Sequence, residues 1–191
     1  MSTSTLTGAT GLDLRGGRLL LAASAVTGVA FAAEAVVSVI VNAHVGYHSL
    51  NLVLNVALLV AGAGFALSGK AVVGQVGVIG GWATALMAVL AGAGGVWAVL
   101  VEGFTAAESP GVVEGISHTA VLASMLFMIP LGIGLRRVDR VSGSVIAASS
   151  ACLVVMVLVG LDQPSMFLAP EAALGLGWLL LSRALPAASD R

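Results

Sequence analysis

Charged residues are scarce in this chain of 191 amino acids, where Asp, Glu, Lys and Arg together make up 9% of the sequence. An average soluble domain carries roughly 25%, so this chain has too few charged side chains to cover a water-facing surface. Hydrophobic residues make up 59%, and the mean hydropathy is +1.09. These values exclude an ordinary water-soluble globular protein and predict a chain that crosses a membrane several times.

Cysteine and an excess of basic charge are lacking as well. The single cysteine, Cys152, lies inside an apolar run, which excludes a disulfide-stabilised scaffold. Eight Lys and Arg residues are balanced by nine Asp and Glu residues, so we expect no nucleic-acid partner. The sequence also lacks a GxSxG motif, a P-loop and a glycine-rich dinucleotide motif.

The apolar runs are long enough for six membrane-spanning helices. A bilayer core of about 30 Å needs about 20 mostly apolar residues per helix. Runs of this kind cover residues 18–41, 50–67, 72–101, 117–135, 144–161 and 166–182. The predicted fold class is therefore all-α: a polytopic integral membrane protein whose six-transmembrane-helix bundle occupies residues 18–182. Residues 1–17 and 183–191 are predicted to form short tails.

The basic residues predict how these spans are oriented. With six spans, all eight fall on one side of the membrane: Arg15, Arg18, Lys70, Arg136, Arg137, Arg140, Arg183 and Arg191. Because an excess of positive charge marks the cytoplasmic side, we predict a multi-pass plasma-membrane protein with both termini and both tails in the cytoplasm. The segments around residues 42–49, 102–116 and 162–165 then face outward. Seven Arg residues against one Lys, with abundant Ala, Gly and Val, are typical of a GC-rich bacterium.

Small residues predict how the helices pack. Gly77 and Gly81 have GxxxG spacing, and residues 91–95 contain only Ala and Gly. Small residues allow close approach of helices in a bilayer, so we expect the span at residues 72–101 to be the central helix. Trp178 is predicted to lie near the inner membrane interface, as a member of an aromatic belt.

Polar and acidic residues collect in the outer half of the predicted bundle. The candidate ligand-binding residues are Glu34, Ser38, Asn42, His48, Asn51, Asn55, His118, Asp162 and Glu171. Residues 34, 38 and 42 have helical spacing, as do residues 48, 51 and 55, so each set shares one face of its helix. A carboxylate at membrane depth is costly unless it is protonated, paired or facing water. We therefore expect Glu34 and Glu171 to line an outward-facing polar cavity where the first and last spans meet. The alternative is that the amide and hydroxyl side chains only form hydrogen bonds between helices.

Three histidines near the outer face permit a different interpretation, a metal site. His44 and His48 are four residues apart, as in helical metal pairs, and His118 with Glu114 would complete a zinc-like ligand set. Zinc or another divalent metal is the cofactor that such a set would bind. No HExxH or CxxC motif accompanies these histidines, so the alternative is that they lie at the water boundary without a metal.

Short motifs in the second half of the chain resemble those of small bacterial six-helix membrane families. They are Gly115-Ile116-Ser117-His118 at the start of a span, Ile129-Pro130 within it, Arg136-Arg137 at its close, and the ending Gly177-Trp178-Leu179-Leu180-Leu181-Ser182-Arg183. These features are most similar to the family designated domain of unknown function nine-nine-eight. The resemblance implies a fold type and no activity.

The length, the six spans and the inward termini also resemble the substrate-binding subunits of energy-coupling-factor vitamin transporters. In that family an alanine-lined helix surface docks the partner subunit. Here Ser24, Gly28 and Ala32 form a stripe of small residues at a spacing of four in the first span. The resemblance implies that this stripe docks a partner subunit.

Three functions are consistent with these features. The leading hypothesis is a non-enzymatic membrane protein whose outward-facing cavity binds, or helps to transport, a small ligand or ion. The second is a membrane-embedded metal-dependent hydrolase that acts on lipid. The third is an accessory subunit of a larger membrane complex. The expected partners are the lipid bilayer, a small-molecule or ion ligand, and other membrane subunits or further copies of the chain.

Overall fold

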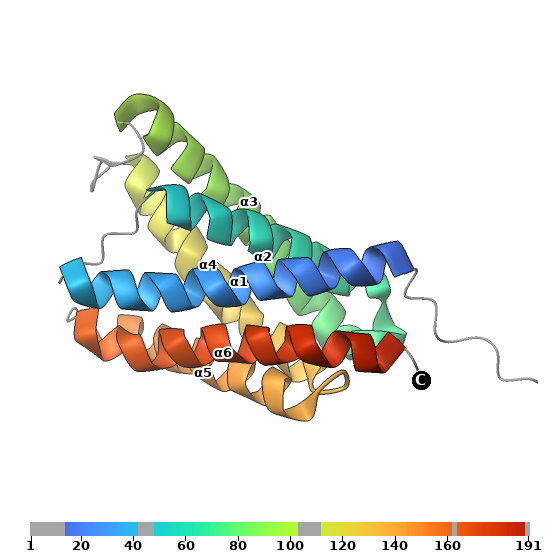
Figure 1. Cartoon of the computed structure of the whole chain (residues 1–191). Helices are drawn as coiled ribbons and strands as arrows, with labels where there is room; N and C mark the ends of the chain where they lie inside the picture. The colour runs from blue at the N-terminus through green and yellow to red at the C-terminus, as the bar shows by residue number, and fades with distance from the viewer. Residues whose placement is uncertain (1–13, 42–47, 103–111, 162–163, 190–191) are drawn as a thin grey trace, which may run out of the picture.

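The computed structural model is all-helical over the residues that it describes, which are 14–41, 48–102, 112–161 and 164–189 (Figure 1). Its helices are α1 (Leu14–Val41), α2 (His48–Ser68), α3 (Lys70–Glu102), α4 (Val112–Leu135), α5 (Arg140–Leu158) and α6 (Pro164–Ser189). Each helix corresponds to one predicted span, so the all-α fold class is confirmed. Within the described residues, α1, α3, α5 and α6 are long and apolar enough to cross a membrane, and α2 and α4 contain shorter apolar segments.

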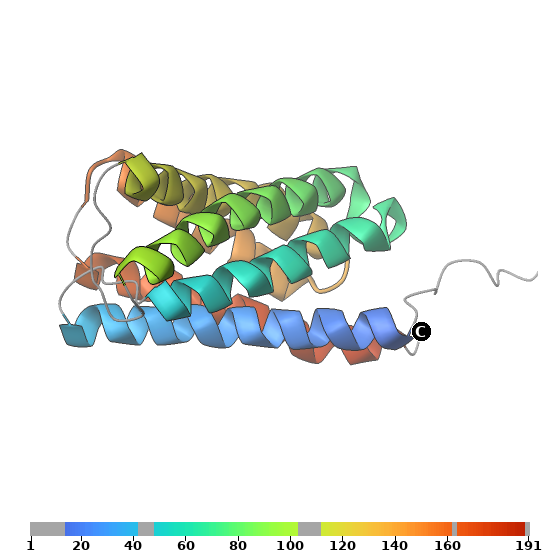
Figure 2. The ribbon, with the colours of Figure 1, turned by 90° about the horizontal axis from the view of Figure 1, so that it is seen from above.

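The helices form a closed ring. Each helix packs mainly against the helices that precede and follow it in the sequence, and α6 packs against α1. Successive helices alternate in direction, so the start of α1 and the end of α6 lie at the same end of the bundle (Figures 1 and 2). The prediction that the first and last spans meet is confirmed. The prediction that the third span is central is wrong, because α3 packs between α2 and α4 and exposes apolar side chains along its length.

Glycine backbones bring neighbouring helices close together at four of the interfaces. The facing pairs are Gly28 with Gly175 (α1–α6), Gly62 with Gly81 (α2–α3), Gly77 with Gly134 (α3–α4) and Gly132 with Gly143 (α4–α5). A Cβ atom on Gly81 would lie 2.6 Å from the carbonyl oxygen of Gly62, and one on Gly77 would lie 3.0 Å from the Cα atom of Gly134. The two glycines of the GxxxG motif therefore pack against different helices. This explains why α3 is rich in small residues without being central.

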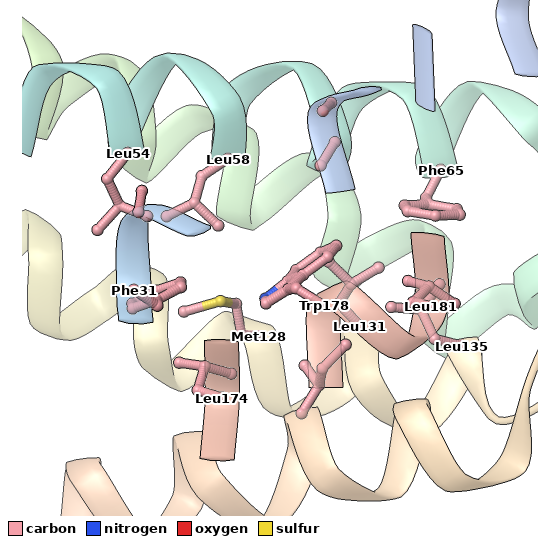
Figure 3. Packing of buried hydrophobic residues seen from close by; sticks show 14 of the residues in the cluster. Phe31, Leu54, Leu58, Phe65, Met128, Leu131, Leu135, Leu174, Trp178 and Leu181 are labelled. Carbon is pink, nitrogen blue, oxygen red and sulfur yellow. The ribbon is translucent and has the colours of Figure 1, made fainter. Parts of the chain in front are cut away.

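Large apolar side chains fill the interior of the ring (Figure 3). Trp178 of α6 lies among side chains from α1, α2 and α4, and its ring centroid is 6.4 Å from that of Phe65. Trp178 is fully buried, so its predicted place in an interfacial belt is wrong. Hydropathy does not distinguish an interface-facing tryptophan from a core one.

The helices extend beyond several predicted spans. α4 begins at Val112 instead of residue 117, α5 begins at Arg140 instead of residue 144, and α6 continues to Ser189, past the predicted end at residue 182. Hydropathy marks where apolar residues begin, whereas a helix continues while its backbone hydrogen bonds and packing contacts continue. Leu185, for example, is buried within the extra C-terminal part of α6, so most of the predicted C-terminal tail is helical.

Candidate functional site

The packing of α1 on α6 sets the register of the candidate site. A Cβ atom on Gly28 would lie 2.8 Å from the carbonyl oxygen of Gly175, and one on Gly175 would lie 3.0 Å from the backbone nitrogen of Ala32. In this antiparallel register, Glu34 of α1 lies level with Glu171 of α6. Glu34 is seven residues before the end of α1, and Glu171 is seven residues after the start of α6. Both are therefore about 10 Å from the same end of the bundle, at a rise of about 1.5 Å per residue.

Glu171 is part of the buried face of α6. This face consists of Phe167, Glu171, Leu174 and Trp178, which recur every three or four residues. Glu171 is only 7% exposed, and its Oε2 atom has no hydrogen-bond partner among the described residues. A buried acidic oxygen without a partner is rare because the lost hydration is not replaced.

Glu34 provides the second carboxyl group of this site. Its side chain is half-buried on α1. The two carboxyl groups interact electrostatically. The structure thus brings together Glu34 and Glu171, as the closure of the bundle led us to expect.

No basic side chain balances this pair within the described residues. Arg18 and Lys70 lie at the start of α1 and of α3, Arg136 and Arg137 follow α4, and Arg183 lies near the end of α6. All of these positions are at the bundle end that lies away from the two glutamates (Figure 1). Ionised together, the two carboxylates would repel each other, so their charge is compensated by a proton or another cation, or is hydrated by water.

Asn55 of α2 is a buried candidate residue on another interface. It is 3% exposed, and its Cβ atom is 3.6 Å from the position that a Cβ atom on Gly92 of α3 would take. Asn55 thus packs between α2 and α3.

The other candidate residues cannot be placed in the site from the described residues. Asn42, His44 and Asp162 lie outside them altogether. Ser38, His48, Asn51, Glu114 and His118 belong to described helices, but their side chains lie outside the described part of the structure. The predicted histidine set is therefore untested. The described residues contain no group of three metal-ligating side chains.

A buried hydroxyl group on α5 was not predicted from the sequence. Ser150 of α5 is fully buried, and its Oγ atom has no hydrogen-bond partner among the described residues. It lies four residues after Ile146, which contacts Gly177 of α6, and it shares the buried face of α5 with that residue. The adjacent serines Ser149 and Ser150 in an apolar run were the available signal, because serine is uncommon on a lipid-facing surface.

The stripe of small residues in α1 does not form a free docking surface. Ser24 is fully buried, and Gly28 packs on the backbone of Gly175 and Leu179 in α6. The partner of this stripe is therefore α6 of the same chain, and the expectation that it docks another subunit is corrected.

Comparisons with family models, curated proteins and solved structures find no match to this chain.

Proposed function

We propose that the chain is a six-span plasma-membrane protein with both termini in the cytoplasm. Large apolar side chains are exposed on all six helices, among them Leu19, Val53, Leu86, Ile133 and Leu176. Polar side chains, in contrast, are found in the interior, where Thr84, Ser150 and Glu171 are buried. An apolar exterior around a partly polar interior is the distribution expected of a bundle surrounded by lipid. The basic residues at one end of the bundle support the cytoplasmic orientation of that end.

Within this bundle, we propose that Glu34 and Glu171 bind a small cation in the outward half, as part of a binding or transport function. The observation that carries this proposal is the pair of carboxyl groups between α1 and α6, with one buried oxygen left without a partner. Two acidic groups without a described basic neighbour favour a positively charged ligand over an anion. Their depth of about 10 Å suits a site reached from the outer surface.

The test measures how cations stabilise the purified protein in a neutral detergent. Sodium chloride and potassium chloride are compared with choline chloride at equal ionic strength, and the thermal unfolding midpoint is recorded. A ligand that binds only the folded state raises this midpoint. We expect sodium or potassium to stabilise the parent protein and Glu102→Gln, in which a glutamate at the outer end of α3 is replaced, but not Glu171→Gln or Glu34→Gln.

Glutamine keeps the shape of glutamate and removes its charge, so both variants should fold. If sodium or potassium chloride raised the thermal unfolding midpoint of Glu171→Gln as much as that of Glu102→Gln, relative to choline chloride, the cations would act elsewhere on the protein. That result would end the proposal for the carboxyl pair.

A further inference from the structure

Four basic side chains gather at the end of the bundle that lies away from the carboxyl pair. Lys70 is the first residue of α3, Arg136 and Arg137 lie in the short connection from α4 to α5, and Arg140 is the first residue of α5. All four side chains are exposed. Because α3 packs closely against α4, the two connections lie next to each other. We refer to these four residues as the basic cluster.

The position of Arg137 is defined by a break at the start of α3. Gly74 has φ +70° and ψ 173°, so the first turn of α3 is separated from the main helix that follows. A Cβ atom on Gly74 would lie 2.9 Å from Cζ and 3.1 Å from Nε of Arg137. The absence of a side chain at Gly74 therefore lets the guanidinium group of Arg137 rest directly on the backbone of α3, next to the turn that begins with Lys70.

The basic cluster has no acidic partner in the described structure. The acidic residue closest to it in sequence is Asp139, whose carboxylate accepts hydrogen bonds from the backbone nitrogen of Ser142, at 2.7 Å, and from the Ser142 hydroxyl group. These bonds hold the pKa of Asp139 below its ordinary value of 3.8 and direct its charge to the first turn of α5. Asp139 is thus occupied as a helix cap, and the four basic side chains form no described ion pair.

Exposed apolar side chains border the basic cluster on the side of the bundle. Leu67 is 72% exposed near the end of α2, three residues before Lys70, and Val141 is 61% exposed directly after Arg140. The basic cluster lies at the end of the bundle, and the exposed apolar side chains lie beside it on the flank. A lipid has the same arrangement, because its charged headgroup lies at the membrane surface and its acyl chains lie below it.

We propose that the basic cluster binds the phosphate of an anionic phospholipid, with Arg137 and Lys70 as its main contacts. A guanidinium group can donate two parallel hydrogen bonds to phosphate oxygens, and a lysine adds a point charge. Leu67 and Val141 contact the acyl chains. The proposal rests on the membrane location proposed above and is independent of the carboxyl pair.

The experiment measures lipid binding to the full chain in a neutral detergent. Phosphatidylglycerol, phosphatidylcholine or inorganic phosphate is titrated into the protein, and bound lipid is counted by native mass spectrometry while the thermal unfolding midpoint is recorded. We expect phosphatidylglycerol to bind and to raise the midpoint, and the other two probes to have no such effect. Removal of one basic side chain should weaken binding about fivefold, as expected for a single charge at a membrane surface.

Arg137→Gln and Lys70→Gln are compared with Arg183→Gln, which removes an exposed arginine at the same end of the bundle but from α6. The first two variants should lose affinity for phosphatidylglycerol, and the third should keep it. Equal losses in all three variants would indicate attraction by net charge alone and overturn the site. Equal binding of phosphatidylcholine, or binding of inorganic phosphate that displaces the lipid, would overturn the assignment to an anionic headgroup. The membrane location itself is tested separately by cysteine labelling, so failure of this lipid site does not bear on it.

Discussion

At the residue scale, Asp139 is an acidic side chain whose role follows from its contacts alone. It is the N-cap of α5 and accepts the backbone N–H of Ser142 at 2.7 Å, together with the hydroxyl group of the same residue. The first turn of a helix has N–H groups without intrahelical acceptors, and a capping side chain supplies one. The carboxylate therefore holds the start of α5 against the connection from α4.

Replacement of Asp139 should destabilise the bundle by a modest amount. We expect Asp139→Ala to lower the free energy of unfolding by about 1 kcal/mol, the usual effect of losing an N-cap. Asp139→Asn should lose less, because asparagine also caps helices well. Unfolding titrations with a denaturing detergent at neutral pH measure both values. An alanine variant as stable as the parent would show that the cap contributes nothing to α5.

The same contacts predict a pH dependence with a definite sign. The pKa of Asp139 is lower in the folded protein than its ordinary value of 3.8 because Ser142 donates hydrogen bonds to the carboxylate. Its stabilising contribution is therefore complete above the ordinary value and is lost as the pH falls through the lower folded value. Between about pH 5 and pH 3, the parent should lose more stability than Asp139→Asn. Parallel stability curves for the two proteins would contradict this assignment.

The position of the carboxyl pair could be predicted from the sequence. The depth of Glu34 and Glu171 follows from their distance to the ends of the apolar runs, and their meeting follows from the closure of the bundle. The burial of Trp178 and Ser150 could not be predicted in the same way. Both residues lie in runs where apolar side chains occupy every face of the helix, so the pattern does not indicate which face points inward.

At the element scale, contacts between glycine backbones allow a close approach of the helices at four of the interfaces in the ring. Gly28 and Gly175 lie where α1 meets α6, and the carboxyl pair is positioned by this same contact. In lipid, helix association depends on close packing because the surroundings are as apolar as the side chains. Replacement of such a glycine by alanine therefore adds a methyl group that pushes the two helices apart.

Gly28→Ala tests the contact between α1 and α6. The added Cβ atom would lie 2.8 Å from the carbonyl oxygen of Gly175 and 2.9 Å from the backbone nitrogen of Leu179, and both are backbone atoms that cannot turn aside. We expect a loss of about 1–3 kcal/mol in the free energy of unfolding, as for other overpacked sites. The variant should also weaken cation binding, since Glu34 moves with α1.

The matched control is Gly95→Ala in α3. A Cβ atom there has no atom within 4 Å, and alanine is a better helix former than glycine by about 1 kcal/mol. We expect this variant to be as stable as the parent or slightly more stable. If Gly28→Ala behaved like Gly95→Ala, the close approach of α1 and α6 would be wrong.

The number and order of the helices could be predicted because each apolar run is long and is separated from the next by polar or glycine-containing residues. The position of α3 in the ring could not be predicted from the sequence. Its glycines were evident in the sequence, but Gly77 and Gly81, which lie one turn apart on the same face of the helix, pack against α4 and α2 respectively. A count of small residues indicates that a helix is closely packed, and it does not distinguish one buried helix from a helix with two close neighbours.

At the scale of the whole molecule, the distribution of side chains is inverted relative to a protein in water. Valine and leucine cover much of the outside, while serine, threonine and glutamate are found inside. The two ends of the bundle also differ, with the basic cluster at one end and the carboxyl pair nearer the other. Both features follow if the bundle spans a bilayer with its basic end in the cytoplasm.

The most direct test of this account is cysteine labelling in intact cells that express the chain in a Cys152→Ala background. Leu161→Cys places an exposed thiol after α5, at the end proposed to face outward, and Arg136→Cys places one in the connection from α4 to α5, at the other end. With a membrane-impermeant maleimide, we expect Leu161→Cys to be labelled at once and Arg136→Cys to be labelled only after the cells are permeabilised. Equal labelling of both variants in intact cells, or recovery of the protein in the soluble fraction, would contradict it.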